Sequence, residues 1–141
     1  KLQNALALSS TLGEDRKKLM NRIGDITGQS EWQARRVAQT ERTRSQSQAS
    51  YAASQEAADQ GVTVYNKWFC RFQNSREAHM ARHGKMAKQG ECFPNSNIRF
   101  PGDPNGSAAE TINCYCMIMP KVILSTEYVD ADGNIRKKEK K

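Results

Sequence analysis

The stretch that decides the fold is residues 61–72, which read GVTVYNKWFCRF. Gly61 ends an alanine-rich helical pattern, and the β-branched and aromatic residues after it predict a strand. Beyond this strand, Ser75 is a candidate N-cap for a short helix over residues 76–83, which Gly84 ends. The chain therefore changes at Gly61 from a helical half to a half that mixes helix and strand.

Further segments complete the second half. Residues 94–107 are rich in proline, glycine and asparagine without any periodicity, so they predict a loop. Residues 112–119 predict a second strand. Asp132-Gly133 lies between the segments 122–129 and 135–138, and this pattern predicts a terminal β-hairpin.

The first sixty residues are predicted to be helical. One apolar stripe consists of Leu2, Leu6, Leu8 and Leu12, and a second consists of Leu19, Met20, Ile23 and Ile26. A third helix is predicted from Glu31 to about Gln60, with Ser30 as its N-cap. Beyond Gln33 its only large apolar residues are Val37 and Tyr51, so it either packs closely through Ala and Ser or projects towards a partner. We favour partner contact.

The patterns predict an α+β fold in three regions. Residues 1–60 form a helical arm, residues 61–120 a small compact domain with one short helix and few strands, and residues 121–141 a β-hairpin with a basic tail. The large apolar residues are distributed accordingly, with 11 in residues 1–60 and 20 in residues 61–128. The core is therefore expected after Gly61.

Length and composition exclude several classes of protein. The chain has 141 residues, which suits one domain with an appendage, and its hydrophobic share of 37% predicts a modest core. No apolar run approaches the ~18–20 residues that span a bilayer, so an integral membrane protein is excluded. Four cysteines are too few for a disulfide scaffold. The first residue is Lys1 and no leader pattern follows it, so we expect a fragment or processed product and find no support for secretion.

The basic charge is concentrated at the C-terminus. Residues 133–141 carry five basic side chains and one acidic side chain, which gives +4 of the formal net charge of +7. Such a segment either contacts DNA non-specifically by releasing counterions or remains a solvated tail. Composition favours the solvated tail, and DNA contact is the alternative.

Two histidines and two cysteines are the residues best suited to chemistry. A helix places His79 and His83 on one face, and a strand points the thiols of Cys114 and Cys116 the same way. Two nitrogens and two sulfurs suit tetrahedral zinc, so these four are the candidate ligands, with Cys92 as an alternative. Their spacing is not that of common zinc fingers. The competing interpretation is a capping histidine with ordinary buried cysteines.

Catalytic interpretations have less support. The histidine pair lacks the glutamate that follows the first histidine in metalloproteases, because that position is Met80. A cysteine–histidine nucleophile pair has no third orienting residue at a matching spacing. Glu41, Glu77 and Glu110 are scattered along the chain and are explained more simply as surface or cap groups than as an acid–base pair.

The order of several short motifs resembles one known family. In chain order the motifs are Thr40-Glu41-Arg42, Gly61-Val62, Lys67-Trp68, Arg76-x-x-His79-x-x-x-His83-Gly84, Glu91-x-Phe93, Pro101-Gly102-Asp103-Pro104 and Glu110-x-Ile112-Asn113-Cys114-x-Cys116, followed by Pro120. Over about residues 34–120, this series resembles the phage head morphogenesis family, the Mu F-like minor head proteins. Two positions depart from the pattern, since the family usually has an acidic residue where Asn74 stands and a basic residue where Tyr115 stands.

The resemblance implies a minor head protein of a tailed bacteriophage that acts in head assembly and is not an enzyme. It implies that the chain lies in the virion near the portal and the capsid interior, that it is oligomeric there, and that assembly takes place in the host cytoplasm. It further implies contact with the portal or the major capsid protein, and a role in DNA packaging or ejection. On this interpretation residues 1–60 are a docking arm and residues 61–120 are the Mu F-like core.

Two alternatives remain open from the residues alone. A zinc-dependent nuclease or toxin-like enzyme accounts for the histidines, the cysteines and the basic end. A plain nucleic-acid-binding module accounts for the basic end only. Metal analysis and the effect of chelation on thermal unfolding distinguish a zinc protein from the other classes.

Overall fold

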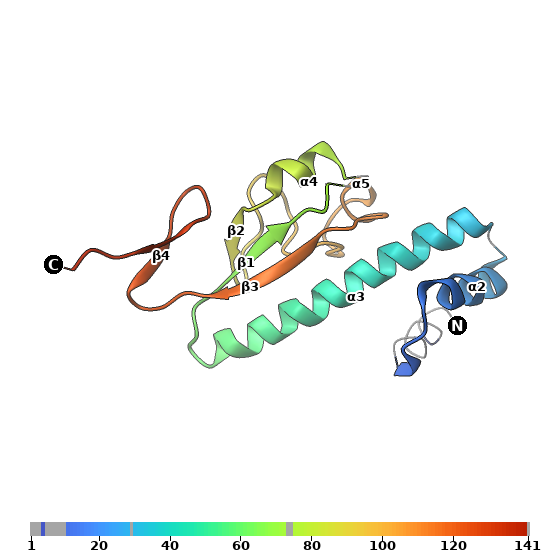
Figure 1. The fold of residues 1–141 in the computed structure, drawn as a ribbon, viewed down its shortest axis with the longest axis horizontal. Helices are drawn as coiled ribbons and strands as arrows, with labels where there is room; N and C mark the ends of the chain where they lie inside the picture. Colours follow the sequence, from blue (N-terminus) through green and yellow to red (C-terminus); the bar gives the residue numbers. More distant parts are fainter. Residues whose placement is uncertain (1–3, 5–10, 29, 73–74, 141) are drawn as a thin grey trace.

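The computed structural model describes residues 4, 11–28, 30–72 and 75–140, and it shows helices and a small antiparallel sheet (Figure 1). The helices are α2 (Arg16–Thr27), α3 (Glu31–Asp59), α4 (Glu77–Arg82) and α5 (Ala108–Thr111), and the strands are β1 (Val64–Phe69), β2 (Met86–Lys88), β3 (Met117–Val122), β4 (Glu127–Val129) and β5 (Ile135–Lys137). The predicted α+β class is confirmed. The predicted stripe of Leu2, Leu6 and Leu8 lies outside the described residues.

Helices α2 and α3 form a pair with a small core of its own. The Asp15 side chain accepts a hydrogen bond from the backbone N–H of Lys18 at 2.9 Å and caps the start of α2, while Gly28 ends it at φ 65°. Apolar residues of the two helices are buried against each other, namely Met20, Ile23, Ala34 and Ala38. In Figure 1, α2 and the start of α3 lie at the opposite end of the molecule from the C-terminal hairpin.

Beyond its contact with α2, helix α3 runs along the sheet. It packs against β3 and β1, as Figure 1 shows. Its buried residues are small or polar, namely Ala34, Ala38, Gln39, Thr40, Thr43, Ser47 and Ser54. Of the two alternatives drawn from the sequence, the structure shows close packing for this face, since small side chains let the helix backbone approach the sheet. Partner contact remains a prediction for the exposed residues of the arm.

The sheet has the order β2-β1-β3, with both pairs antiparallel. The register places Trp68 opposite Ile118 and Phe69 opposite Met117. Every second residue of β1 is buried, so Asn66 and Trp68 point towards the interior. The amide of Asn66 donates to Gln89 Oε1 at 2.8 Å, which satisfies this polar group in the interior.

The main core lies between the sheet, α3 and the loop before α5. Its buried members are Trp68, Cys70, Ala87, Phe93, Ile98, Phe100, Cys114, Cys116 and Ile118. The Trp68 ring meets the Phe93 ring edge-on at a centroid distance of 5.1 Å, and Tyr51 of α3 packs against Phe100 at 5.1 Å. The core therefore gathers after Gly61, as the distribution of apolar residues predicts.

The predicted C-terminal hairpin is present as β4 paired with β5. Asp130 begins its turn, since its carboxylate accepts from the backbone N–H groups of Asp132 and Asn134 at 3.0 and 2.8 Å. Gly133 has φ 83° and is buried, and a Cβ there would lie 2.7 Å from the carbonyl oxygen of Gly84. The tip of the hairpin therefore rests against the turn between α4 and β2.

Replacement of Gly102 by alanine is expected to destabilise the fold by about 1–3 kcal/mol. Gly102 has φ 79°, and a Cβ would lie 2.9 Å from Arg44 Cα on helix α3. The matched control is Gly90→Ala, because Gly90 also has a positive φ of 93° but has no atom within 4 Å of the position that a Cβ would take. Urea unfolding of both variants separates the two effects. Equal losses would contradict the close approach of Gly102 to α3 as a source of strain.

Within the part of the chain that the structure describes, no helix is both long and apolar enough to cross a membrane.

Candidate metal centre

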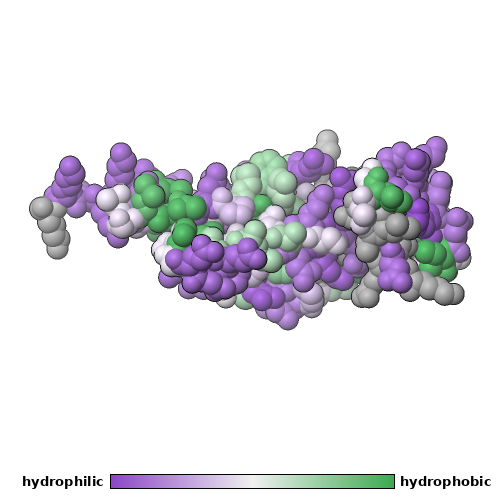
Figure 2. Space-filling view, turned by 90° about the horizontal axis from the view of Figure 1, so that it is seen from below, coloured by the Kyte–Doolittle hydropathy of each residue, from purple (hydrophilic) through white to green (hydrophobic). Residues whose placement is uncertain are grey.

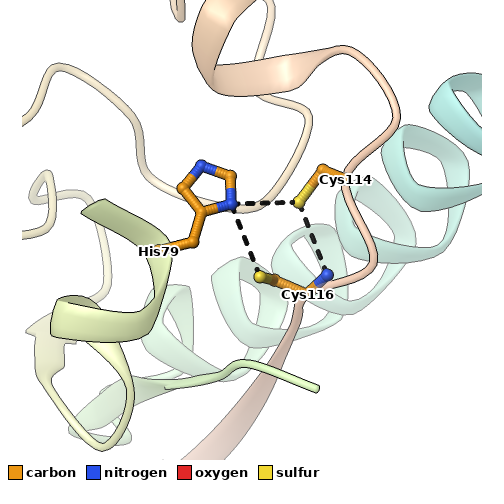
Figure 3. A group of neighbouring side chains, drawn as sticks. All are labelled: His79, Cys114 and Cys116. Atoms are coloured by element: carbon orange, nitrogen blue, oxygen red, sulfur yellow. Dashed lines mark hydrogen bonds between the residues drawn. The ribbon is translucent and has the colours of Figure 1, made fainter. Parts of the chain in front are cut away.

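Three potential metal ligands meet in the interior of the small domain (Figure 3). His79 comes from α4, and Cys114 and Cys116 come from the segment that leads into β3. The Nδ1 atom of His79 lies 3.6 Å from Cys114 Sγ and 3.5 Å from Cys116 Sγ. The three side chains are almost fully buried, with exposed fractions of 1%, 1% and 4%.

The distances within this cluster fit a tetrahedral ion. Nitrogen binds zinc at ~2.0–2.1 Å and sulfur at ~2.3 Å, so two such ligands at a tetrahedral angle lie about 3.5 Å apart. The two nitrogen–sulfur distances of 3.6 and 3.5 Å agree with this value. All three ligand atoms lie within 4.8 Å of one another, so the cluster could hold a metal ion with little rearrangement.

The orientation of His79 is set by a carboxylate on its far side. Nε2 of His79 lies 3.0 Å from Oε2 of Glu110 in α5, and Arg82 donates to the same oxygen at 3.2 Å. A histidine that donates Nε2–H to a carboxylate keeps the lone pair of Nδ1 free for a ligand, as metal-bound histidines do. The guanidinium of Arg82 also lies over the Trp68 ring at 4.8 Å, which fixes the Arg82–Glu110 pair in place.

Buried polar residues of α3 position the two cysteines. The carbonyl oxygen of Cys114 accepts hydrogen bonds from Gln39 Nε2, at 3.2 Å, and from the hydroxyl of Thr43. The backbone N–H of Asn113 donates to Thr40 Oγ1 at 2.8 Å, and Asn113 itself has φ 54°. Helix α3 therefore holds the backbone at the Cys-x-Cys segment, and this explains why it buries polar side chains.

The two thiols affect each other's pKa in opposite directions. The pKa of Cys114 is lowered, because the Cys116 thiol and then His79 stabilise its thiolate more strongly than burial opposes it. The pKa of Cys116 is raised by its hydrogen bond with Cys114, by burial, and by the charge of the neighbouring Cys70. The pair therefore favours one thiolate that shares the proton of its neighbour, and a cation would stabilise both thiolates.

The structure separates the sequence candidates. It brings together His79, Cys114 and Cys116, but it places His83 outside this group of ligand atoms. His83 is exposed, accepts the backbone N–H of Cys70 at 3.1 Å through Nδ1, and lies against Phe72 at a ring distance of 4.8 Å. Helical spacing puts both histidines on one face, but α4 ends at Arg82, one residue before His83. The alternative ligand Cys92 is exposed and is not part of the group.

The sequence does not assign several residues that support the cluster to a site. Glu110 begins one of the family motifs but is explained there as a surface or cap group, although it lies beside His79, and neither Gln39 nor Thr43 belongs to a recognisable site motif. The available signal for α3 is the run of polar residues at helical spacing on a helix with few apolar residues. Glu41 forms an ion pair with Arg44 at 3.1 Å instead of facing the cluster.

Replacement of Glu110 by glutamine is expected to cost about 1–3 kcal/mol at neutral pH, because two partners lose a charged acceptor. Burial would raise the pKa of Glu110, but hydrogen bonds and charge from Arg82 and His79 lower it overall. This stabilisation is therefore present above the unfolded pKa of about 4.5 and is lost as the pH falls through the lower folded pKa.

Urea unfolding between pH 7 and pH 3 measures this effect. The difference between wild type and the Glu110→Gln variant should shrink as the pH falls below about 4.5. Glu91→Gln is the control, since Glu91 is exposed, and its difference from wild type should stay small. A Glu110→Gln difference that is constant over this range would contradict the role of the charge.

The fold and the cluster together define a class of protein. This is a small α+β domain with a helical pair, built around a buried cluster of one histidine and two cysteines that could hold a metal ion. The family model described as Phage Mu protein F like protein matches residues 1–119, and the chain belongs to this family. The searches of curated proteins and of solved structures found no match.

Membership of this family assigns the chain to phage head morphogenesis, and the resemblance drawn from the motifs is confirmed. A head protein is associated with the virion and interacts with other virion components. The family is one of structural head proteins, which agrees with a role that is not enzymatic.

Proposed function

We propose that the chain is a minor head protein of a tailed phage that acts near the portal and the capsid interior during head assembly. The observation that supports this most is the family match over residues 1–119, which covers the helical pair and the sheet together. The buried cluster agrees with a structural role, because His79 is 1% exposed and a substrate cannot reach it. A zinc nuclease would need a ligand position that its substrate can reach.

The helical arm is the region that we propose docks on the portal. Helix α2 and the first part of α3 pack mainly on each other and project beyond the sheet (Figure 1). Two large apolar side chains on this arm are strongly exposed, Leu12 at 61% and Trp32 at 59%. Exposed apolar side chains at an arm suit contact with a larger protein surface.

A second apolar patch lies at the other end of the molecule. Figure 2 shows apolar surface near the C-terminal hairpin, and Val122 and Leu124 are exposed there at 57% and 58%. We assign this patch to contact with the major capsid protein or with neighbouring copies in the virion. The two ends of the chain therefore offer different surfaces to different partners.

Co-purification with the portal ring tests the docking proposal. The wild-type chain, mixed with assembled portal, is expected to co-purify with it, and the Leu12→Ser/Trp32→Ser variant is expected to lose most of that binding. The matched control is Val122→Ser/Leu124→Ser, which changes equally exposed residues at the hairpin end and should retain portal binding. Failure of the wild type to bind portal, or equal loss in both variants, would contradict docking through the arm.

We also propose that the basic tail contacts DNA non-specifically. Arg136 donates to Asp130 at 2.9 Å and Lys138 Nζ donates to the carbonyl of Ser125 at 2.9 Å, and Lys137 and Lys140 are further exposed cations of the tail. Lys137→Gln/Lys140→Gln should weaken DNA binding and reduce its salt dependence by up to about two phosphate contacts. Unchanged binding and salt dependence would contradict contact through the tail.

We propose zinc as the ion that the buried cluster holds. One imidazole nitrogen and two thiolates form a donor set that suits zinc, and the carboxylate behind His79 completes the usual support of a histidine ligand. The residues would bind the ion and set its coordination geometry, and bound zinc would link α4 to the segment before β3. Measured zinc content of the purified chain tests this, with one ion per chain expected and none contradicting it.

A further inference from the structure

We infer that Cys70 is a fourth ligand, so that the site is a closed set of three cysteines and one histidine. This inference rests on the proposed zinc site and deepens it. Structural zinc sites are almost always four-coordinate and closed, whereas the three residues of the cluster leave one position unfilled. The fourth ligand therefore has to come from a side chain that reaches the same buried space.

The strand register brings Cys70 to that space. Strands β1 and β3 pair antiparallel with Phe69 opposite Met117. Continuing this register by one residue places Cys70 opposite Cys116, and directly opposite residues have Cβ atoms about 4.5–5.5 Å apart. Cys70 has an exposed fraction of 0% and belongs to the same buried cluster as Cys114 and Cys116.

The backbone around Cys70 resembles the backbone around a known member of the cluster. The N–H of Phe72 donates to Cys70 Sγ at 3.4 Å, and the N–H of Cys116 donates to Cys114 Sγ at 3.4 Å. In both cases the donor lies two residues after the cysteine, and such bonds stabilise a thiolate. Phe72 adopts φ 60°, a strained conformation for a phenylalanine, and this conformation accompanies the Phe72 N–H bond to Cys70 Sγ.

Cys70 packs in the same buried core as Cys114 and Cys116, but its sulfur is not at ligand distance from theirs. Cys70 is not among the atoms that lie within 4.8 Å of one another, so its side chain has to turn towards the ion on binding. The alternative Cys92 is exposed, and Glu110 is already held by His79 and Arg82.

The proposed coordination joins three parts of the chain. Cys70 follows β1, His79 lies on α4, and Cys114 and Cys116 precede β3. The ion would thus connect the ends of two paired strands, β1 and β3, to α4. Because the four ligands would come from three parts of the chain, loss of one ligand should weaken binding without removing the rest of the site.

Cobalt substitution tests the ligand set in the chain of 141 residues. Absorption from sulfur-to-cobalt charge transfer reports how many thiolates bind the ion, and the bands of the metal itself report tetrahedral geometry. The wild type should show three thiolates, and Cys70→Ser should bind cobalt with the intensity of two thiolates and bind zinc at least about tenfold more weakly. Cys92→Ser is the matched control and should behave as the wild type, since Cys92 is exposed.

The possible results distinguish the role of Cys70 from the proposed zinc site on which it rests. An unchanged cobalt spectrum and zinc affinity in Cys70→Ser would overturn the role of Cys70 and leave a three-ligand zinc site. No metal in the wild type would overturn both the inference and the zinc proposal, and family membership would be unaffected. A disulfide between Cys70 and Cys116 in freshly purified protein would also overturn it.

X-ray absorption of the zinc-loaded wild type gives an answer that needs no variant. Three sulfur neighbours and one nitrogen neighbour are expected. Two sulfur neighbours with additional nitrogen or oxygen would overturn the assignment, including in the case that Cys70→Ser does not fold.

Discussion

Removal of the proposed zinc ion by a chelator is expected to lower the midpoint of thermal unfolding by about 12 °C. An ion that binds only the folded chain stabilises it by about 4 kcal/mol when its free concentration is a thousandfold above Kd. For a chain of this size, each kcal/mol corresponds to about 3 °C. The ligands are buried and come from separate segments, so their loss affects α4 and β3 together.

Thermal melts with and without chelator measure this effect. The Cys114→Ser variant is the matched control, because it lacks one ligand and binds zinc more weakly, so the chelator should lower its melt by less than that of the wild type. Cys92→Ser, which changes an exposed cysteine outside the cluster, should respond to the chelator as the wild type does. A wild-type melt that the chelator leaves unchanged would refute a structural role for zinc.

Replacement of Trp68 by alanine is expected to destabilise the chain by about 3–5 kcal/mol, a large part of the total stability of a small domain. The Trp68 side chain has an exposed fraction of 0%. Its ring lies against Phe93 at 5.1 Å and His79 at 5.4 Å, and Arg82 covers it at 4.8 Å. Its loss therefore leaves a cavity and also removes the packing that holds His79 and Arg82 at the proposed metal site.

Chemical unfolding of Trp68→Ala and Trp32→Ala compares two tryptophans in opposite environments. Trp32 is 59% exposed and contacts Arg36 at 5.2 Å, so its replacement should cost less than about 1 kcal/mol. The Trp68→Ala variant should also lose zinc affinity, because His79 loses its neighbour. Similar stability of the two variants would contradict the central place of Trp68 in the core.

Local patterns predicted those parts of the fold that depend on local physics. Gly61 and the β-branched residues after it place the change from helix to strand, and Ser30 begins α3 as its capping pattern predicts. Asp132-Gly133 predicts the hairpin, which pairs β4 with β5. Each of these depends on a few neighbouring residues, so the sequence carries the information directly.

The candidate site was predicted only in part. Helical spacing paired His79 with His83, but α4 is six residues long and ends before His83, and the second histidine is not part of the group of ligand atoms. The spacing of Cys114 and Cys116 did predict two thiols side by side, and both lie at His79. Whether a short helix ends at Arg82 or continues through His83 depends on how it packs, which the sequence does not show.

By itself, the sequence determined the α+β class, the position of the core after Gly61, the Cys-x-Cys pair and, through the order of its motifs, the family. The tertiary structure decided which distant residues meet. It placed Glu110 behind His79 and set Gln39 and Thr43 of α3 against Cys114, although more than seventy residues separate Thr43 from Cys114. The register of β1 with β3 ends with Phe69 opposite Met117, directly before Cys70 and directly after Cys116. Such contacts depend on how whole elements pack and pair, and no local pattern of residues encodes them.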